Sequence, residues 1–184
     1  MSWNLSNSPP TLNLGNAYTN NTSYNSNATL VPSLNCFLKG TMILTRDNGY
    51  VAIENLNNGD ILKTTYGETK LVKKLYRNVP GIQENLPYKI PQNHYGNNTP
   101  SQDTYLSPLH CIWAQGDWLC MCQSNFKQDE TKLNEELMYY HLLTTDYSKD
   151  FVFCNGLVSE SLKPTQENYE LYKECIDEMV GEKL

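Results

Sequence analysis

Short runs of alternating apolar and polar residues begin after residue 36 and are typical of β-strands. In the first part of this region the predicted strands are residues 41–45, 50–56, 60–65 and 69–76. Turn sequences separate them, and the Asn-Gly pairs at 48–49 and 58–59 supply the positive φ that tight turns need. The pattern therefore predicts a series of short antiparallel strands.

The second half of this region repeats the pattern after a break. Residues 77–104 are rich in Pro, Gly and Asn, which predicts a long loop with a few extended pieces. The predicted strands that follow are 104–113, 117–122, 138–145 and 151–161, with hairpin turns at Ala114–Asp117 and Asn155-Gly156. The charged segment 129–137 is compatible with either a short helix or an exposed connection.

The last 21 residues, 164–184, have a different periodicity and predict one amphipathic helix. Thr165 is a suitable N-cap and Gly181 a suitable residue to end the helix. One apolar face combines Leu171, Tyr172, Cys175, Ile176, Met179 and Val180. Many short strands and a single late helix predict an all-β core with one C-terminal α-helix packed on it.

The composition restricts the classes of partner. With 184 residues, 39% hydrophobic and 18% charged, the chain is long enough for one core of fair size. A net charge of -6 argues against nucleic acid and anionic membranes as main partners. No apolar stretch reaches the roughly 18 residues of a membrane span, and no signal peptide is recognisable. We therefore expect a soluble protein in a reducing intracellular compartment, with its six cysteines mostly reduced.

A cysteine marks the boundary between two kinds of sequence. Residues 1–35 carry no charged side chain and are dominated by Asn, Ser, Thr and Pro, as in a leader or linker. Cys36 stands directly after them, where the strand pattern starts. A buried structural cysteine needs no such position, whereas a cysteine that attacks the preceding peptide bond does. We therefore favour Cys36 as a nucleophile over a small buried apolar residue.

Three sequence blocks resemble a Hint (hedgehog/intein) domain of the non-splicing bacterial and viral branch. They are "CFLKGTMILTRDNGYVAIENLNNGDILKT" from Cys36, "PYKIPQNHYGNNTPSQDTYLSPLHCIW" ending in Ser107-Pro108-Leu109-His110, and "YYHLLTTDYSKDFVFCNGLVSES" up to Ser161. The resemblance implies a horseshoe-like β fold and three regions: a leader (1–35), a Hint domain (36–163) and the helix (164–184).

The resemblance also implies autocatalytic processing in cis, with the leader as substrate and Asn35–Cys36 as the scissile bond. Cys36 would attack the Asn35 carbonyl in an N-to-S acyl shift, and His110 would protonate the leaving nitrogen. Ser107 would donate a hydrogen bond to the scissile amide, and His141 would orient Cys36 or act as its base. Water or a small thiol would then resolve the thioester. No cofactor is expected.

Some of these residues also allow a second interpretation, a metal site. His110, Cys111, Cys120 and Cys122 form a possible metal cluster, but a Cys-x-Cys pair is not the usual zinc spacing. Strand alternation would also direct Cys111 away from His110. We therefore expect no metal site, and we expect Cys154 and Cys175 to pack in the core.

One departure from the inteins limits the activity. Where inteins end in His-Asn before a nucleophile, this sequence reads Glu160-Ser161. Splicing is therefore not expected, and only cleavage at the upstream junction remains. The alternative is a catalytically degenerate Hint fold that serves as a structural or interaction module, with the leader as an assembly or binding arm.

Overall fold

The computed structural model describes residues 36–145 and 151–161, and every regular element in these two ranges longer than three residues is a β-strand. The strands are β1 (Phe37–Leu38), β2 (Met42–Thr45), β3 (Gly49–Ala52), β4 (Ile61–Thr64), β5 (Gly67–Pro80), β6 (Tyr88–Ile90), β7 (Thr104–Leu106), β8 (Cys111–Ala114), β9 (Asp117–Cys120), β10 (Lys127–Gln128), β11 (Glu136–Thr144), β12 (Val152–Cys154) and β13 (Leu157–Ser159). Four single 3₁₀ turns lie between them: η2 (Ile53–Asn55), η3 (Gln83–Asn85), η4 (Met121–Gln123) and η5 (Glu130–Lys132).

The predicted all-β class is confirmed. The predicted leader (1–35) and C-terminal helix (164–184), including Cys175, lie outside the described residues. Within the described ranges, no helix is long and apolar enough to span a membrane.

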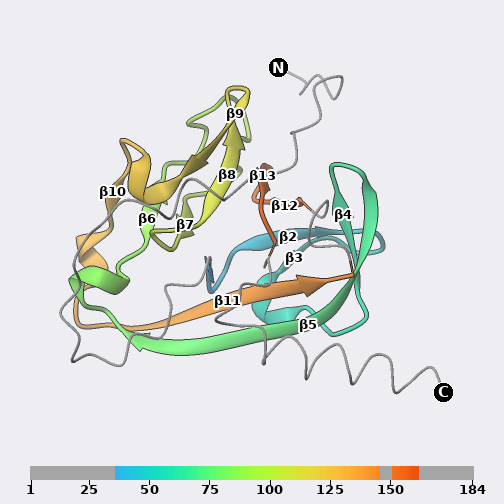
Figure 1. The fold of residues 1–184 in the computed structure, drawn as a ribbon, viewed down its shortest axis with the longest axis horizontal. Coiled ribbons are helices and arrows are strands. Elements are labelled where there is room, and N and C mark those ends of the chain that lie inside the picture. Colours follow the sequence, from blue (N-terminus) through green and yellow to red (C-terminus); the bar gives the residue numbers. More distant parts are fainter. Residues whose placement is uncertain (1–35, 146–150, 162–184) are drawn as a thin grey trace, which may run out of the picture.

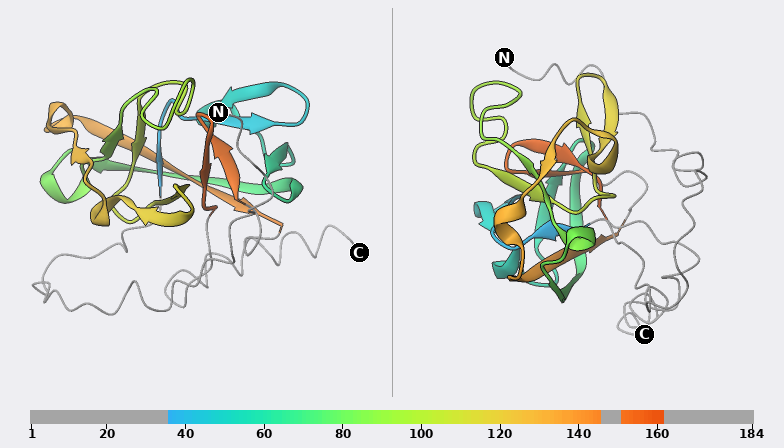
Figure 2. Two further views of the ribbon diagram at one scale, coloured as in Figure 1. Left: turned by 90° about the horizontal axis from the view of Figure 1, so that it is seen from above. Right: turned by 90° about the vertical axis from the view of Figure 1, so that its left-hand side faces the viewer.

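The strands form one curled sheet in the order β10-β6-β7-β1-β11-β5-β4-β2-β12-β13-β8-β9, with β3 paired to β2. The antiparallel β5–β11 ribbon spans the molecule, from the end that holds β6 and β10 to the end that holds β4 (Figure 1, Figure 2). The short strand β1 pairs with β11 on one side and with β7 on the other. The start of the chain's first strand is therefore enclosed by strands from much later in the sequence.

Two predicted hairpin turns are present and have the backbone that their residues suggest. β8 and β9 are joined by Gln115 and Gly116, and β12 and β13 by Asn155 and Gly156, all with positive φ. Two central residues with positive φ define the turn whose twist matches that of the flanking strands. At Gly156 a Cβ would also meet the Asn98 carbonyl oxygen at 2.9 Å, so the position requires glycine.

The most important difference from the prediction is the length of β5. The sequence pattern predicts a strand only to residue 76 and a loop from 77, but β5 continues to Pro80 because residues 136–139 of β11 pair with it. Local composition does not predict this extension, since a strand from a distant part of the sequence supplies the hydrogen bonds. The extension places Arg77 in the sheet.

The strand predicted over residues 50–56 is also shorter than expected. It ends at Ala52, and Ile53–Asn55 form the turn η2 instead. The amide of Leu56 donates to the Ile53 carbonyl, which closes this turn and ends the extended path. The segment 129–137, left open between helix and connection, contains the turn η5 and the start of β11.

Alternation along β11 separates two apolar clusters. Tyr140 and Leu142 face the main core, together with Phe37 of β1. Leu137 and Tyr139 face the other side, where they form a smaller cluster with Cys36 and Leu38. The predicted nucleophile therefore lies on the face of β11 opposite the main core.

Candidate active site

Cys36 directly precedes β1, and its side chain is fully buried. Its backbone amide donates a 2.8 Å hydrogen bond to Oγ of Ser107, and its carbonyl accepts one of 3.0 Å from the Ser107 amide. The amide concerned is the nitrogen of the predicted scissile bond, Asn35–Cys36. The Ser107 hydroxyl therefore accepts a hydrogen bond from this nitrogen. The sequence had instead predicted that the hydroxyl donates to the amide.

His141 contacts the sulfur of Cys36 directly, with 2.7 Å between Sγ and Nε2. The contact follows from strand register, because Phe37 pairs with Tyr140 and Leu38 with Tyr139. The next position in this antiparallel register brings Cys36 opposite His141 on the same face. The predicted pair therefore comes together from segments 105 residues apart.

Burial keeps this pair uncharged. It raises the pKa of Cys36 to about 12, against the opposing charge and hydrogen bond of Arg77 and a hydrogen bond from Ser107. Burial also lowers the pKa of His141 to about 3, and the charges of His110 and Arg77 lower it further. At neutral pH a neutral thiol therefore contacts a neutral imidazole, and in the tautomer whose Nε2 accepts the thiol proton, the ring proton sits on Nδ1. Among the described residues, that Nδ1 is buried and has no hydrogen-bond partner.

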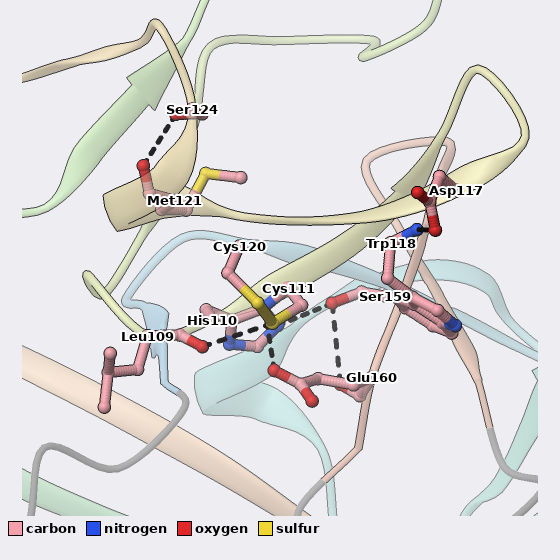
Figure 3. Close-up of a disulfide and its surroundings, with 10 residues drawn as sticks. All are labelled: Leu109, His110, Cys111, Asp117, Trp118, Cys120, Met121, Ser124, Ser159 and Glu160. Carbon is pink, nitrogen blue, oxygen red and sulfur yellow. Dashed lines mark hydrogen bonds between the residues drawn. A yellow bond between two sulfur atoms is a disulfide. The ribbon is translucent and has the colours of Figure 1, made fainter. Parts of the chain in front are cut away.

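His110 lies one turn after Ser107, and its amide donates to the Ser107 carbonyl. Its buried ring packs edge-on against Phe37, the residue after Cys36, with ring centroids 4.4 Å apart. Nε2 of His110 is hydrogen-bonded to Oγ of Ser159 on β13 at 2.5 Å (Figure 3). This bond fixes the orientation of the imidazole beside the start of β1.

The four predicted site residues therefore come from three segments. Cys36 directly precedes β1, Ser107 and His110 flank the turn between β7 and β8, and His141 lies in β11. The pairing of β1 with both β7 and β11 brings these segments together. The arrangement places an imidazole at the thiol and a hydroxyl at the amide nitrogen beside it.

One neighbour of Cys36 was missed from sequence. Arg77 on β5 pairs with Tyr139 of β11, and its charge and hydrogen bond act on the Cys36 thiol. The sequence held no signal for it, because residue 77 was assigned to a loop.

A comparison with known protein families also identifies a Hint domain. The sequence model of the Hint domain family matches residues 35–166, which is most of the chain. This chain belongs to the Hint domain family. Its family is therefore a Hint-type autoprocessing family. Among curated proteins, no match was found.

Solved structures with a similar fold include an intein-like domain and an intein. The bacterial intein-like domain from Clostridium thermocellum gives a TM-score of 0.50 at 16% identity, covering 70% of this chain and 99% of that one. The gp41-1 intein gives a TM-score of 0.45 at 13% identity, covering 69% of this chain and 98% of that one. At these identities the likeness concerns the fold alone.

The downstream end of this Hint domain is built differently from its upstream end. Glu160 and Ser161 are buried, and Oε1 of Glu160 accepts a 2.7 Å hydrogen bond from the Cys111 amide. The nearby Asn155 is also engaged, since its side chain accepts from the Met42 amide and donates to Thr104. These side chains support the hairpin and its neighbours.

A disulfide joins Cys111 to Cys120, a pairing that was not predicted from the sequence (Figure 3). The two residues pair directly across the β8–β9 hairpin with their Cα atoms 3.9 Å apart, which brings the sulfurs into bonding distance. Of the other described cysteines, Cys36 and Cys154 are buried and free, and Cys122 is exposed and free. The predicted core position of Cys154 is confirmed.

No metal cluster forms around these cysteines. Within residues 36–145 and 151–161, no three His, Cys, Asp or Glu side chains are arranged to hold a metal ion. The disulfide also removes two of the thiolates on which the metal alternative depended.

Proposed function

We propose that this Hint domain cleaves its own chain between Asn35 and Cys36. The observation that carries the proposal is the double contact of Cys36: Sγ lies 2.7 Å from Nε2 of His141, and the backbone nitrogen lies 2.8 Å from Oγ of Ser107. A general base on the sulfur and a polar group on the adjacent amide are what an N-to-S acyl shift requires.

In the first step, His141 takes the thiol proton and the sulfur bonds to the Asn35 carbonyl carbon. The bond from that carbon to the Cys36 nitrogen then breaks, and the nitrogen gains a proton from His110. His141 gains a positive charge and His110 loses one, so the net charge is unchanged and the step needs no co-reactant. Because Ser107 holds the existing N–H, the new proton must arrive on the other side of the nitrogen.

This rearrangement works against the resonance of a planar amide, which makes the peptide nitrogen a poor leaving group. The product is a thioester between residue 35 and the Cys36 sulfur. Water adds to it to give a carboxylate on the leader and a free amine and thiol on Cys36. A small thiol instead exchanges with the Cys36 sulfur and leaves the leader as a new thioester.

The second candidate is a degenerate Hint fold that acts as a structural or interaction module with the leader as its arm. One observation favours it: the resting thiol has a pKa of about 12 and its base a pKa of about 3. Such a pair transfers a proton uphill, so cleavage, where it occurs, is a slow single turnover.

Intact mass spectrometry distinguishes the two candidates. The full chain is incubated at pH 7 to 8 alone, with dithiothreitol and with a phosphine reductant. Both reagents reduce the Cys111–Cys120 disulfide, but only dithiothreitol carries a thiol that attacks a thioester. We expect loss of the first 35 residues, faster with dithiothreitol than with phosphine.

The variants assign the chemistry to residues. Cys36→Ala is expected to abolish the mass loss, and His110→Ala to slow it by about 10²-fold or more, the usual contribution of a positioned acid or base. Cys122→Ser is the matched control, since that thiol is free but exposed, and it should cleave like the wild type. An unchanged mass in the wild type over several days would establish the module instead.

A further inference from the structure

Among the residues that the structure describes, Arg77 carries a charge without a counter-charge. Its Nε is buried and has no hydrogen-bond partner, and no carboxylate lies within ion-pair distance of its guanidinium in the part of the chain that the structure describes. Taking a cation out of water without a compensating anion is costly. Although Arg77 is only half-buried, its unpartnered Nε suggests that an anion forms beside it.

The strand register identifies where that anion forms. Arg77 pairs with Tyr139 of β11, and Tyr139 also pairs with Leu38 of β1. Paired residues of antiparallel strands share a face, so Arg77 lies on the face that carries Cys36 and His141. Tyr139 itself is held elsewhere, because its hydroxyl donates to the Asn85 carbonyl at 2.8 Å.

The groups around Cys36 differ in how they respond to Arg77. They are His141 and Tyr139 from β11, Ser107 and His110 from the turn before β8, and Arg77 from β5. Toward the Cys36 sulfur, Arg77 acts through both its charge and a hydrogen bond, whereas toward His141 it acts through its charge alone. The guanidinium therefore favours a negative sulfur and also opposes a protonated imidazole.

We propose that Arg77 is the counter-cation of the Cys36 thiolate and stabilises the sulfur anion that attacks the Asn35 carbonyl. The inference rests on the proposed self-cleavage and names the group that makes its nucleophile available. An arginine suits this task because its guanidinium stays protonated and directs several N–H donors at one anion.

The test measures thiolate availability separately from cleavage. The intact chain is treated at pH 8 with a small thiol-specific reagent, methyl methanethiosulfonate, and modification of each cysteine in the uncleaved chain is followed by peptide mass spectrometry. Cys154 is an internal reference in the same molecule, since it is free, fully buried and also has a pKa raised to about 12 by burial. Changes in local opening or reagent access are thereby separated from changes at Cys36.

Three variants are compared with the wild type. Arg77→Gln should slow modification of Cys36 by about tenfold and leave the modification rate of Cys154 unchanged. Tenfold corresponds to the smallest pKa shift, about one unit, that a nearby opposite charge usually causes. Arg77→Lys keeps the charge and should restore most of the rate. Lys70→Gln removes a positive charge from an exposed position of the same strand and should behave as wild type.

The outcomes separate this inference from the proposed function. Equal Cys36 rates in the wild type and Arg77→Gln, an equal fall at Cys154, or a lysine variant as slow as the glutamine variant would overturn the role of Arg77. A chain that never cleaves but shows the tenfold fall at Cys36 contradicts the self-cleavage, while the role of Arg77 as counter-cation of the thiolate stands. Where cleavage occurs, Arg77→Gln should slow it at pH 7 by a similar factor.

Discussion

At the scale of single residues, the Cys36–His141 contact combines proximity with low reactivity. The sulfur and the imidazole nitrogen are 2.7 Å apart, yet burial favours the neutral form of each group. Thiolate is the reactive form of cysteine, so a buried neutral thiol is protected from side reactions until its proton leaves. The same burial makes the stability of the domain depend on pH.

The first residue-scale prediction concerns acid. His141 has a pKa of about 3 in the folded chain and an ordinary value near 6.5 when unfolded, so below pH 6.5 only the unfolded chain binds this proton. The stability that His141 contributes is therefore present above pH 6.5 and is lost as the pH falls toward 3. Urea unfolding should show a loss of about 2 kcal/mol between pH 7 and pH 5 from this residue.

Two variants isolate that contribution. His141→Gln removes the titrating group and should flatten the decline by this amount, whatever its effect on stability at pH 7. His94→Gln, which changes an exposed histidine, should keep the wild-type decline. Identical pH dependence in the wild type and His141→Gln would contradict a neutral buried imidazole at this position.

At the scale of elements, the β8–β9 hairpin shows that a turn sequence determines which residues pair along both strands. The predicted turn at Ala114–Asp117 already implies that Trp113 pairs with Trp118, and continuing that register brings Cys111 opposite Cys120. The disulfide was therefore within reach of sequence reasoning. It was missed because compartment, rather than register, was used to assign the state of the cysteines.

The disulfide gives the element-scale prediction. It closes a loop with a sequence separation of 9, for which the loss of chain entropy in the unfolded state is worth about 2–3 kcal/mol. A phosphine reductant should lower the free energy of unfolding of the wild type by this amount in urea titrations. The double variant Cys111→Ser with Cys120→Ser should already have the lower stability and show no further response to the reductant.

Register between distant strands also decides the neighbours of the candidate site. The β5–β11 pairing extends past the end of the predicted strand, and this extension brings Arg77 opposite Tyr139. Short elements with strong turn residues were predicted well, because the determinants are local. The extension of β5 was not, since Arg77, Asn78 and Pro80 have no strand preference and depend on a distant partner.

At the scale of the whole molecule, the two ends of the Hint domain are not equivalent. The upstream end combines a thiol, an imidazole and a hydroxyl around one amide. At the downstream end the residues are Glu160 and Ser161, and the Glu160 carboxylate accepts from the Cys111 amide. A carboxylate cannot replace the asparagine side-chain nitrogen that cyclises in inteins.

A fusion experiment tests this asymmetry. With a small folded tag attached after residue 184, we expect the tag to remain joined to the Hint domain while the leader is lost. Intact mass over the same time course reports both junctions at once. Release of the tag, or a ligated product of leader and tag, would contradict the asymmetry, and a tagged Cys36→Ala chain provides the uncleaved reference.

The sequence by itself determined what depends on near neighbours and on motif order. The β-strand alternation, the Asn-Gly turns and the candidate residues Cys36, Ser107, His110 and His141 can all be read along the chain, because local backbone preference and family blocks are properties of short segments. Tertiary structure decided which of these groups touch. The pairing of β1 with β7 and β11 sets the contacts of the thiol, and the long β5 brings in the arginine. The physical reason is that strand register and burial, which control distances and pKa values, arise between segments about 40 to 105 residues apart.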